Sequence, residues 1–393
     1  MNKFLGACLL IAGCSIGAGM LGLPSATGAS GFLPSLCFFF LAWLYMLLTG
    51  LVLTEVTASY PKGYSFISMA ENTFGKWGAA LTWILFSLLF YTIQVAYFIG
   101  GGIFVIDFFD LAASVNLTLP VASFMLGLLF FIAITRGFQL VDSLNRYFMV
   151  GLLLCYLLLI FAGLPHIELS RLERRDWGGA FLSLPLLIVC FGFHNLVPSL
   201  YSYLDGDKKK LQKAILVGSL VPLFIYLAWE VVILGVVPFS FKEEWEEVYQ
   251  KGEMVTQILQ KYSGIDEVVA CGRAFTFFAI ATSFLPVAFS FFDFLKDALK
   301  LEPTKKNRAL LALLVLLPPL ICANTKPDSF LAALEYAGGC VAVLLFGLLP
   351  LLMAIKKQKT STFEIAKPRL LGVLFVATCA ILAITLLHRL GII

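Results

Sequence analysis

Apolar residues are gathered into long blocks along this 393-residue chain, and short polar stretches separate the blocks. Hydrophobic residues make up 60% of the sequence and charged residues only 13%. A block of roughly 20 apolar residues is long enough to cross a bilayer as a helix. The pattern therefore predicts an all-α polytopic membrane protein with spans at 4–30, 33–57, 78–106, 118–134, 144–164, 181–204, 211–236, 267–292, 308–323, 329–354 and 370–388.

Positive charge is distributed unevenly between the two sides of this predicted arrangement. With the N-terminus inside, nineteen of the 28 Lys and Arg residues fall on the cytoplasmic side and eight on the opposite side. Cytoplasmic loops carry such an excess, so we expect a cytoplasmic N-terminus and a periplasmic C-terminus. The net charge of +4 follows from this topology and gives no reason to expect a nucleic-acid partner.

The residues that usually hold cofactors, metals or catalytic centres show no suitable spacing. All nine cysteines fall inside predicted spans, which leaves no extramembrane disulfide framework. The three histidines lie far apart, and none has metal-ligand spacing to a cysteine or a carboxylate. The sequence contains no nucleophile elbow, intramembrane aspartate pair or His-Glu metal motif. We therefore expect neither a cofactor nor an enzyme.

The first span contains a segment that is poorly suited to a continuous helix. Residues 13–24 read Gly-Cys-Ser-Ile-Gly-Ala-Gly-Met-Leu-Gly-Leu-Pro. A glycine costs a helix interior about 1 kcal/mol relative to alanine, so the cluster predicts unwinding near Gly17. Non-helical backbone at this depth is tolerated only against protein or a cavity, and broken helices carry the substrate sites of many transporters. Close helix packing is the other common reason for such glycines.

A second break is predicted in span six. Its sequence Cys190-Phe191-Gly192-Phe193-His194-Asn195 places a glycine and a His-Asn pair near mid-membrane, 175 residues after Gly17. Five spans separate the two breaks, and an odd number reverses the direction of the chain, so the halves are predicted to be inverted repeats. We expect one transmembrane domain, residues 1–393, with repeats at about 4–164 and 181–354 and an additional helix at about 370–388.

Two motifs, Gly17-Ala18-Gly19-Met20-Leu21-Gly22-Leu23-Pro24 and Phe191-Gly192-Phe193-His194, together with the eleven spans, resemble the bacterial aromatic amino acid permeases. The similarity covers essentially the whole chain. Within the hydroxy and aromatic amino acid permease family, the chain resembles the tyrosine- or tryptophan-specific transport proteins. The resemblance implies a five-plus-five inverted-repeat core with discontinuous helices one and six, as in the wider amino acid, polyamine and organocation transporters. It also implies proton-driven symport across the inner membrane.

An amino acid presents a carboxylate and an ammonium group, and the two breaks offer partners for both. The outer half of span one would begin a helix whose unpaired N–H groups and dipole attract the carboxylate. Free carbonyls at both breaks would accept from the ammonium group. The predicted substrate-binding residues are Ser15, Ile16, Gly17, Ala18, Gly19 and Met20 in span one and Cys190, Phe191, Gly192, Phe193, His194 and Asn195 in span six.

The substrate side chain would lie between spans one, three, six and eight. Tyr91, Gln94 and Tyr97 share one face of span three, and Phe278 and Thr282 share one face of span eight. Aromatic contacts contribute about 0.5 to 1.5 kcal/mol beyond area burial. Phenylalanine accounts for 37 of the 393 residues, so lipid contact and packing also explain an aromatic face.

His194, Thr282 and Ser283 are the candidate residues for ion coupling. Histidine titrates in a range that suits a proton carrier, and a neutral imidazole bonded to the unwound backbone is the alternative. The Thr282-Ser283 pair could join backbone carbonyls around a sodium ion or bond to its own helix. The family resemblance favours protons, and the hydroxyl pair keeps sodium as the alternative.

Charged side chains inside spans are candidates for gating. Arg273 and Glu335 lie at matching depths in spans eight and ten, so an ion-paired outer gate is one hypothesis. Glu55 and Glu230 lie nearer the ends of their spans, where snorkelling to the interface explains them. In the external segment 237–265, apolar residues at helical spacing predict an amphipathic lid over the outer vestibule or, equally, a solvated surface helix.

Two other functions are compatible with the same sequence. A serine, threonine or other neutral amino acid permease, coupled to sodium or protons, would use the same backbone site. A channel would place carbonyls or charges around an oligomeric axis, and paired broken helices in one chain do not indicate such a ring. We expect a secondary active transporter whose partners are an amino acid, a coupling ion and the lipid bilayer.

Overall fold

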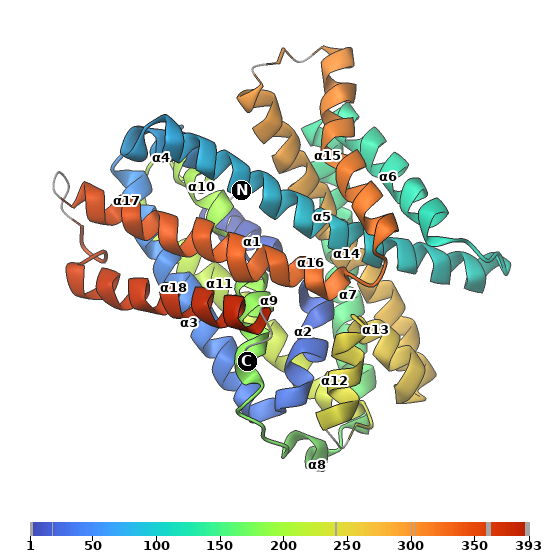
Figure 1. Cartoon of the computed structure of the whole chain (residues 1–393). Coiled ribbons are helices and arrows are strands. Elements are labelled where there is room, and N and C mark those ends of the chain that lie inside the picture. Colours follow the sequence, from blue (N-terminus) through green and yellow to red (C-terminus); the bar gives the residue numbers. More distant parts are fainter. Residues whose placement is uncertain are drawn as a thin grey trace.

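The computed structural model describes residues 3–17, 19–239, 242–299, 301–302, 304–358 and 363–389, and every regular element among them is helical (Figure 1). The eleven predicted spans are confirmed as ten long apolar segments and one pair of helices bent by 53°. The first five spans are α1 (Lys3–Ser15) with α2 (Gly19–Thr27), α3 (Phe32–Ala58), α5 (Lys76–Ala113), α6 (Leu119–Arg136) and α7 (Phe138–Gly163). The next four are α9 (Leu184–Cys190) with α10 (Val197–Tyr203), α11 (Lys208–Val236), α14 (Asp266–Ala298) and α15 (Lys305–Thr325). Span ten consists of α16 (Phe330–Tyr336), η6 (Ala337–Leu348) and α17 (Leu349–Lys357), and span eleven is α18 (Pro368–Arg389).

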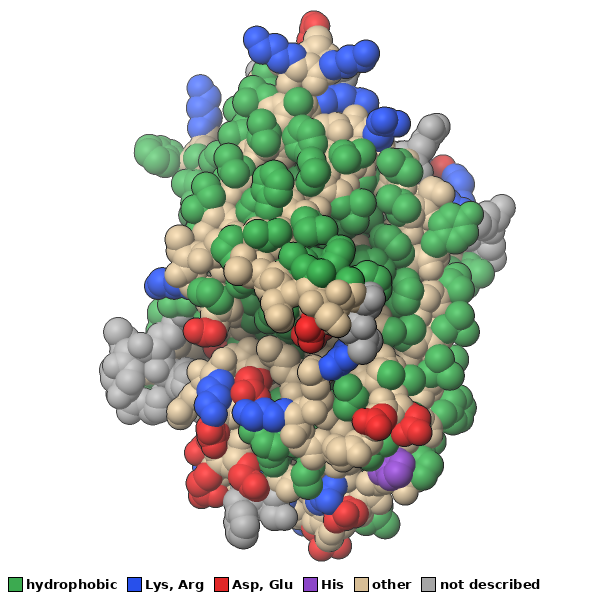
Figure 2. All heavy atoms as spheres, turned by 90° about the vertical axis from the view of Figure 1, so that its right-hand side faces the viewer, with side chains coloured by type: hydrophobic (Ala, Val, Ile, Leu, Met, Phe, Trp, Pro, Cys, Tyr) green, Lys and Arg blue, Asp and Glu red, His purple; other side chains and the backbone are tan. Residues whose placement is uncertain are grey.

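The outer surface of the helices is strongly apolar. Figure 2 shows a broad belt of hydrophobic side chains, with basic side chains at one end of the molecule and mixed charges toward the other. Phe124, Phe161 and Phe224, on three different helices, are 60%, 65% and 64% exposed. Apolar exposure on this scale indicates contact with a second apolar phase. The chain is therefore a multi-pass membrane protein.

Glycine and short polar residues set several span boundaries. Gly137 has a φ of +107° and alone separates α6 from α7, a conformation that favours glycine. Thr304 accepts from the Asn307 amide at the start of α15, and Asp207 accepts from the Lys210 amide at the start of α11. Because such caps lie outside the bilayer, the helices run a few residues beyond the apolar blocks that predicted them.

The two broken spans lie at the centre of the bundle, and the long spans surround them (Figure 1). α2 packs against α9, and α1 packs against α11. α3 also packs against α11, α5 against α14 and α6 against α15, so spans two, three and four contact their counterparts in the second half. These contacts are compatible with the predicted inverted repeats, which stay a prediction.

Two helical features have no counterpart in the predictions. A short helix, α4 (Phe66–Phe74), lies between spans two and three. In the middle of span ten, η6 is a 12-residue π-helical segment, and π-helical turns often occur at functional sites. A Cβ at Gly338 would lie 1.7 Å from the carbonyl oxygen of Pro185, so glycine is required for η6 to approach α9. Other short elements are η1 (Gly28–Ser30), η2 (Leu164–His166), α8 (Leu169–Leu172), η3 (Ala180–Ser183), η4 (His194–Leu196), α13 (Val255–Ile258) and η5 (Leu259–Ser263).

The segment between spans seven and eight contains the predicted amphipathic helix, α12 (Lys242–Gln250). Trp245 and Val248 on its buried face are each 1% exposed. The Trp245 ring lies so close to Gly28 that a Cβ there would be 2.2 Å from it. α12 therefore covers the end of span one at Gly28, while its role as a lid stays a prediction.

Glu55 on α3 and Glu230 on α11 do not snorkel, because they are 2% and 0% exposed. The Glu55 carboxylate accepts hydrogen bonds from the backbone N–H groups of residues 364–366 at 2.8 to 3.2 Å. The Glu230 carboxyl contacts the hydroxyl of Thr27 at the end of α2. The snorkelling interpretation is wrong because protein groups, and not interfacial water, surround both side chains.

Candidate functional site

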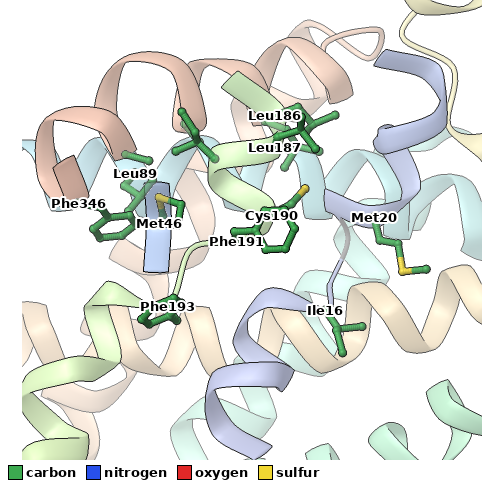
Figure 3. Packing of buried hydrophobic residues seen from close by; sticks show 14 of the residues in the cluster. Ile16, Met20, Met46, Leu89, Leu186, Leu187, Cys190, Phe191, Phe193 and Phe346 are labelled. Carbon is green, nitrogen blue, oxygen red and sulfur yellow. The ribbon is translucent and has the colours of Figure 1, made fainter. Parts of the chain in front are cut away.

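The break between α1 and α2 and the break between α9 and α10 lie against each other. Figure 3 shows the two unwound connections side by side, with Ile16 on one and Phe193 at the end of the other. The Cys14 thiol donates to the carbonyl oxygen of Gly192 at 3.4 Å and lies 3.8 Å from the side-chain oxygen of Asn195. The predicted discontinuities in spans one and six are confirmed.

Gly17 and Gly19 allow neighbouring helices to approach the break in span one. A Cβ at Gly17 would lie 2.0 Å from the hydroxyl oxygen of Ser283 on α14. A Cβ at Gly19 would lie 2.6 Å from the Cys190 sulfur at the end of α9. Atoms in packed interiors cannot approach this closely. The two glycines are thus required by packing as well as by the unwound backbone.

Tyr226 on α11 joins the two breaks. Its side chain is fully buried, and its hydroxyl oxygen lies 3.1 Å from the carbonyl oxygen of Cys190 and within hydrogen-bonding distance of that of Ser15, so its one proton is shared between two acceptors. These carbonyls lie at the C-terminal ends of α9 and α1, where helices leave carbonyl groups without intrahelical partners. Sequence reasoning missed Tyr226 because it lies in an ordinary apolar span. Its position inside the span, away from the charged residues at the span's start, was the one indication in the sequence that this hydroxyl is buried.

A cavity lies between the two breaks, α5, α14 and span ten. The empty space of the cavity, including the part open to solvent, is about 570 Å³. In the described part of the chain, no charged side chain lines it. Seven predicted site residues line the cavity: Ser15, Gly17, Gly19, Tyr97, Cys190, Gly192 and Asn195. Its other lining residues are Cys14, Leu89, Phe90, Ile93, Val189, Val287, Leu334 and Phe346.

The model of the tryptophan/tyrosine permease family matches residues 1–388. The chain belongs to this family. The permease is 29% identical to a tryptophan-specific transport protein from Pseudomonas aeruginosa, over 91% of its own length and 87% of that protein. It is 31% identical to tyrosine-specific transport system 2 from Haemophilus influenzae, over 86% and 84% of the two chains. It is 27% identical to glutamine transporter 2 from Aliivibrio fischeri, over 92% and 91%. Family membership confirms the resemblance and makes the chain an aromatic amino acid permease and not an enzyme.

On α5 of the permease, two of the three predicted residues lie outside the cavity wall. The Tyr91 hydroxyl donates to the carbonyl oxygen of Leu314 on α15 at 2.8 Å. Gln94 is fully buried, and its amide donates to the Phe90 carbonyl of the same helix at 3.2 Å. Tyr97 alone among the three lines the cavity, on the side of α5 that also carries Phe90 and Ile93.

The three predicted residues on α14 contact different parts of the molecule. The Phe278 ring lies against α7, where a Cβ at Gly151 would be 2.5 Å from it. The Thr282 hydroxyl donates to the Phe278 carbonyl at 2.7 Å, within its own helix. The Ser283 hydroxyl lies against Gly17 and has no hydrogen-bond partner among the described residues. Ser283 is thus the member of the hydroxyl pair that faces the break.

His194 lies behind the cavity and is fully buried. Its ring is stacked between those of Phe193 and Phe346, at 4.8 and 4.9 Å. Its Nε2 lies 2.9 Å from the Thr49 hydroxyl, and its Nδ1 has no partner among the residues that the structure describes. Burial between two aromatic rings suits a neutral imidazole.

The remaining predicted residues of the breaks are packed among helices. Ile16 and Met20 are 7% and 0% exposed, and Figure 3 shows both beside the break in span one. The Phe191 ring meets that of Tyr226 edge-on at 5.3 Å. Ala18 lies outside the described residues.

Arg273 on α14 and Glu335 on α16 each interact with a different element. The Tyr249 hydroxyl of α12 donates to the Glu335 carboxylate, and the charge of Arg273 acts on Asp107 of α5. The direct pairing of Arg273 with Glu335 stays a hypothesis.

Proposed function

We propose that the permease is a proton symporter that imports tyrosine or tryptophan across the bacterial inner membrane by alternating access. The observation that carries this proposal is the uncharged cavity between two abutting helix breaks, lined by backbone and by aromatic and aliphatic side chains. The basic end of the molecule would face the cytoplasm, together with the N-terminus.

The amino acid's charged groups would bind to the breaks. The carboxylate would meet the first turn of α2 near Gly19, where N–H groups lack intrahelical partners and the helix dipole is favourable. The ammonium group would approach the carbonyls of Ser15, Cys190 and Gly192, which the Tyr226 hydroxyl and the Cys14 thiol hold in place.

The aromatic side chain would extend toward α5 and span ten. Phe90, Ile93 and Tyr97 line the cavity on α5, and Leu334 and Phe346 line it on span ten. Rings of this kind favour an aromatic guest through offset and edge contacts. The backbone groups recognise the part that all amino acids share, so these side chains would set selectivity.

A neutral amino acid permease of broader or different selectivity is the second candidate. It is supported by the relative named a glutamine transporter, which is 27% identical over 92% of this chain. Such a protein could use the same backbone groups and, through Ser283 beside Gly17, a sodium ion in place of the proton.

A competition experiment in proteoliposomes tests the choice of substrate. Uptake of radiolabelled tryptophan would be measured with unlabelled tyrosine, phenylalanine, serine, threonine or glutamine in excess. The proposal expects strong competition by aromatic amino acids and little by the others. Stronger competition by glutamine, serine or threonine would support the second candidate instead.

A further inference from the structure

Glu230 is a buried carboxyl group that no part of the proposed substrate site uses. It is 0% exposed on α11. Its Oε1 contacts the Thr27 hydroxyl of α2, and its Oε2 has no hydrogen-bond partner among the described residues. The indole N–H of the adjacent Trp229 also has no hydrogen-bond partner among the described residues. An ionised carboxylate in such a place is costly because nothing replaces its hydration.

The surroundings supply no counter-charge. In the described part of the chain, no Lys, Arg or His nitrogen lies within ion-pair distance of Glu230. The guanidinium groups of Arg171 and Arg174 donate to backbone carbonyls of residues 235–236 and 28–29. α2 and η1 carry no titratable side chain. The titratable or charged groups on the other elements around this part of α11 are Cys14 on α1, Cys37 on α3, Tyr156 on α7, His166 on η2, Glu168 and Arg171 at α8, Arg174 after α8 and Arg273 on α14.

Counting protons around Thr27 distinguishes the two forms of Glu230. The Thr27 hydroxyl oxygen lies 2.7 Å from the carbonyl oxygen of Leu23 and also contacts Glu230. A hydroxyl has one proton to donate. With Glu230 ionised, that proton serves only one of two acceptors. With Glu230 protonated on Oε1, the carboxyl donates to Thr27 and Thr27 donates to Leu23, so each contact contains one proton.

We propose that Glu230 is the proton-binding site through which this permease couples a proton to transport. The inference rests on the proposed proton symport and names the group that carries it. When the proton leaves, the Thr27 hydroxyl turns to the carboxylate, the Leu23 carbonyl loses that bond, and the charge requires water. Thr27 ends the nine-residue helix α2, which begins at the cavity-lining Gly19. Protonation of Glu230 therefore acts on the helix that would hold the substrate carboxylate.

The same observations separate Glu230 from His194. His194 also has a buried polar atom, Nδ1, without a partner among the described residues, but its ring is stacked against those of Phe193 and Phe346. Glu230 instead contacts the outer half of span one, one of the two discontinuous helices. If Glu230 carries the proton, substituting Glu230 uncouples transport from the proton gradient. If His194 carries it, substituting His194 does so instead.

Gradient-driven uptake by Glu230→Gln protein tests the proposal. Proteoliposomes would hold the membrane potential at zero with the interior one pH unit more alkaline, and radiolabelled tryptophan would be outside. One proton per substrate predicts about tenfold accumulation by the unmodified permease. E230Q should equilibrate tryptophan without accumulating it, while still exchanging labelled for unlabelled tryptophan across the membrane. Tenfold accumulation by E230Q overturns the proposal, as does loss of accumulation in His194→Gln with E230Q unaffected.

The unmodified protein separates failure of this inference from failure of the proposed function. No uptake of tryptophan or tyrosine by unmodified permease contradicts the function itself. Accumulation that ignores the pH gradient contradicts proton coupling and, with it, the role of Glu230. Accumulation by both the unmodified protein and E230Q contradicts the role of Glu230 alone.

Infrared spectroscopy keeps the proposal testable if E230Q does not fold. The unmodified permease at neutral pH should show the C=O stretching band of a protonated carboxyl group, and Thr27→Val should shift it to higher frequency by removing its hydrogen-bond partner. Absence of the band, or a band unchanged in T27V, overturns the proposal.

Discussion

The Tyr226 hydroxyl lies 3.1 Å from the carbonyl oxygen of Cys190 and within hydrogen-bonding distance of that of Ser15. A side chain of span seven thus contacts the C-terminal ends of the first half-helices of spans one and six. Both carbonyls lie beside the cavity, and both belong to residues that line it. Together with the Cys14 thiol, which donates to the Gly192 carbonyl, the Tyr226 hydroxyl therefore holds the two breaks against each other.

We expect Tyr226→Phe to weaken both stability and substrate binding. Leaving buried carbonyls unpaired costs about 1 to 3 kcal/mol, and the freed backbone would no longer hold its acceptors toward the substrate. Thermal unfolding and the KM for tryptophan uptake measure the two effects. The matched control is Tyr156→Phe, which removes a hydroxyl that donates to the Ile225 carbonyl away from the cavity. Equal rises in KM for both variants would contradict the role of Tyr226 at the site.

We expect Gly17→Ala to abolish or severely reduce uptake. The new methyl group would lie 2.0 Å from the Ser283 hydroxyl oxygen, so α14 or the break must shift. Gly372→Ala is the control, because nothing lies within 4 Å of a Cβ at that glycine. It should transport normally and be as stable as the original protein or slightly more so. Normal uptake by G17A would show that the break tolerates the displacement.

We expect Glu55→Gln to destabilise the permease without a specific effect on substrate selectivity. The carboxylate accepts from three consecutive backbone N–H groups before α18, and an amide side chain would turn an N–H toward them. The loss should be about 1 to 3 kcal/mol, measured by thermal unfolding in detergent. Glu364→Gln is the control, since Lys208 lies 3.6 Å from the Glu55 carboxylate and 3.3 Å from that of Glu364, but the Glu364 side chain is 63% exposed. Equal destabilisation by the two variants would contradict this reading of Glu55.

The ion pair between Asp176 and Lys242 ties α12 to the loop before span six at 2.7 Å. The Lys242 hydrogen bond lowers the pKa of the Asp176 carboxyl from its ordinary value of 3.8. This stabilisation is present above that ordinary pKa and is lost as pH falls through the lowered pKa. The pKa of Lys242 is raised from 10.5, chiefly by its hydrogen bond to Asp176, so at the other extreme the pair is lost as pH rises through that higher pKa.

Hydrogen exchange of residues 242–250 checks this pair. Once intrinsic exchange is corrected for, protection should be constant between about pH 5 and 9 and should fall in strong acid or high salt. Asp176→Asn should reduce protection at neutral pH by no more than a few-fold, because both side chains are partly exposed. Glu247→Gln, which removes the pair between Glu247 on α12 and Lys251 just after it, is the control. A larger effect for E247Q would show that the tie to the loop is not what holds α12.

The spans and their breaks could be predicted because each depends on local sequence. Apolar block length gave the eleven spans, and the glycines near Gly17 and Gly192 gave the breaks. The partners of the breaks could not be predicted from local sequence. Tyr226 and Glu230 contact span one because α11 packs against it, although each lies more than 200 residues from its partner in the sequence. The π-helical segment η6 was missed for the same reason. Gly338 and Gly339 are explained by contact with Pro185 on α9, and Gly347 by contact with Tyr45 on α3, and no local pattern indicates these partners.

The separation of cavity-lining from packed residues also depended on tertiary structure. Tyr91 and Tyr97 share one predicted face of span three, yet Tyr91 bonds to Leu314 on α15 whereas Tyr97 lines the cavity. Leu89, Phe90 and Ile93 also line the cavity, so Tyr91 lies at cavity depth but on another side of α5. At about 100° per residue, side chains six positions apart point about 120° apart, and only the packing of neighbouring helices decides which of them meets the cavity.

Uptake of tryptophan and tyrosine by purified permease in proteoliposomes tests the central claim most directly. With a pH gradient as the only driving force and no sodium present, the internal concentration of either amino acid should rise above the external one and fall back when a proton uncoupler is added. Uptake that stops at equal concentrations, or that requires sodium, would contradict proton-coupled import of aromatic amino acids.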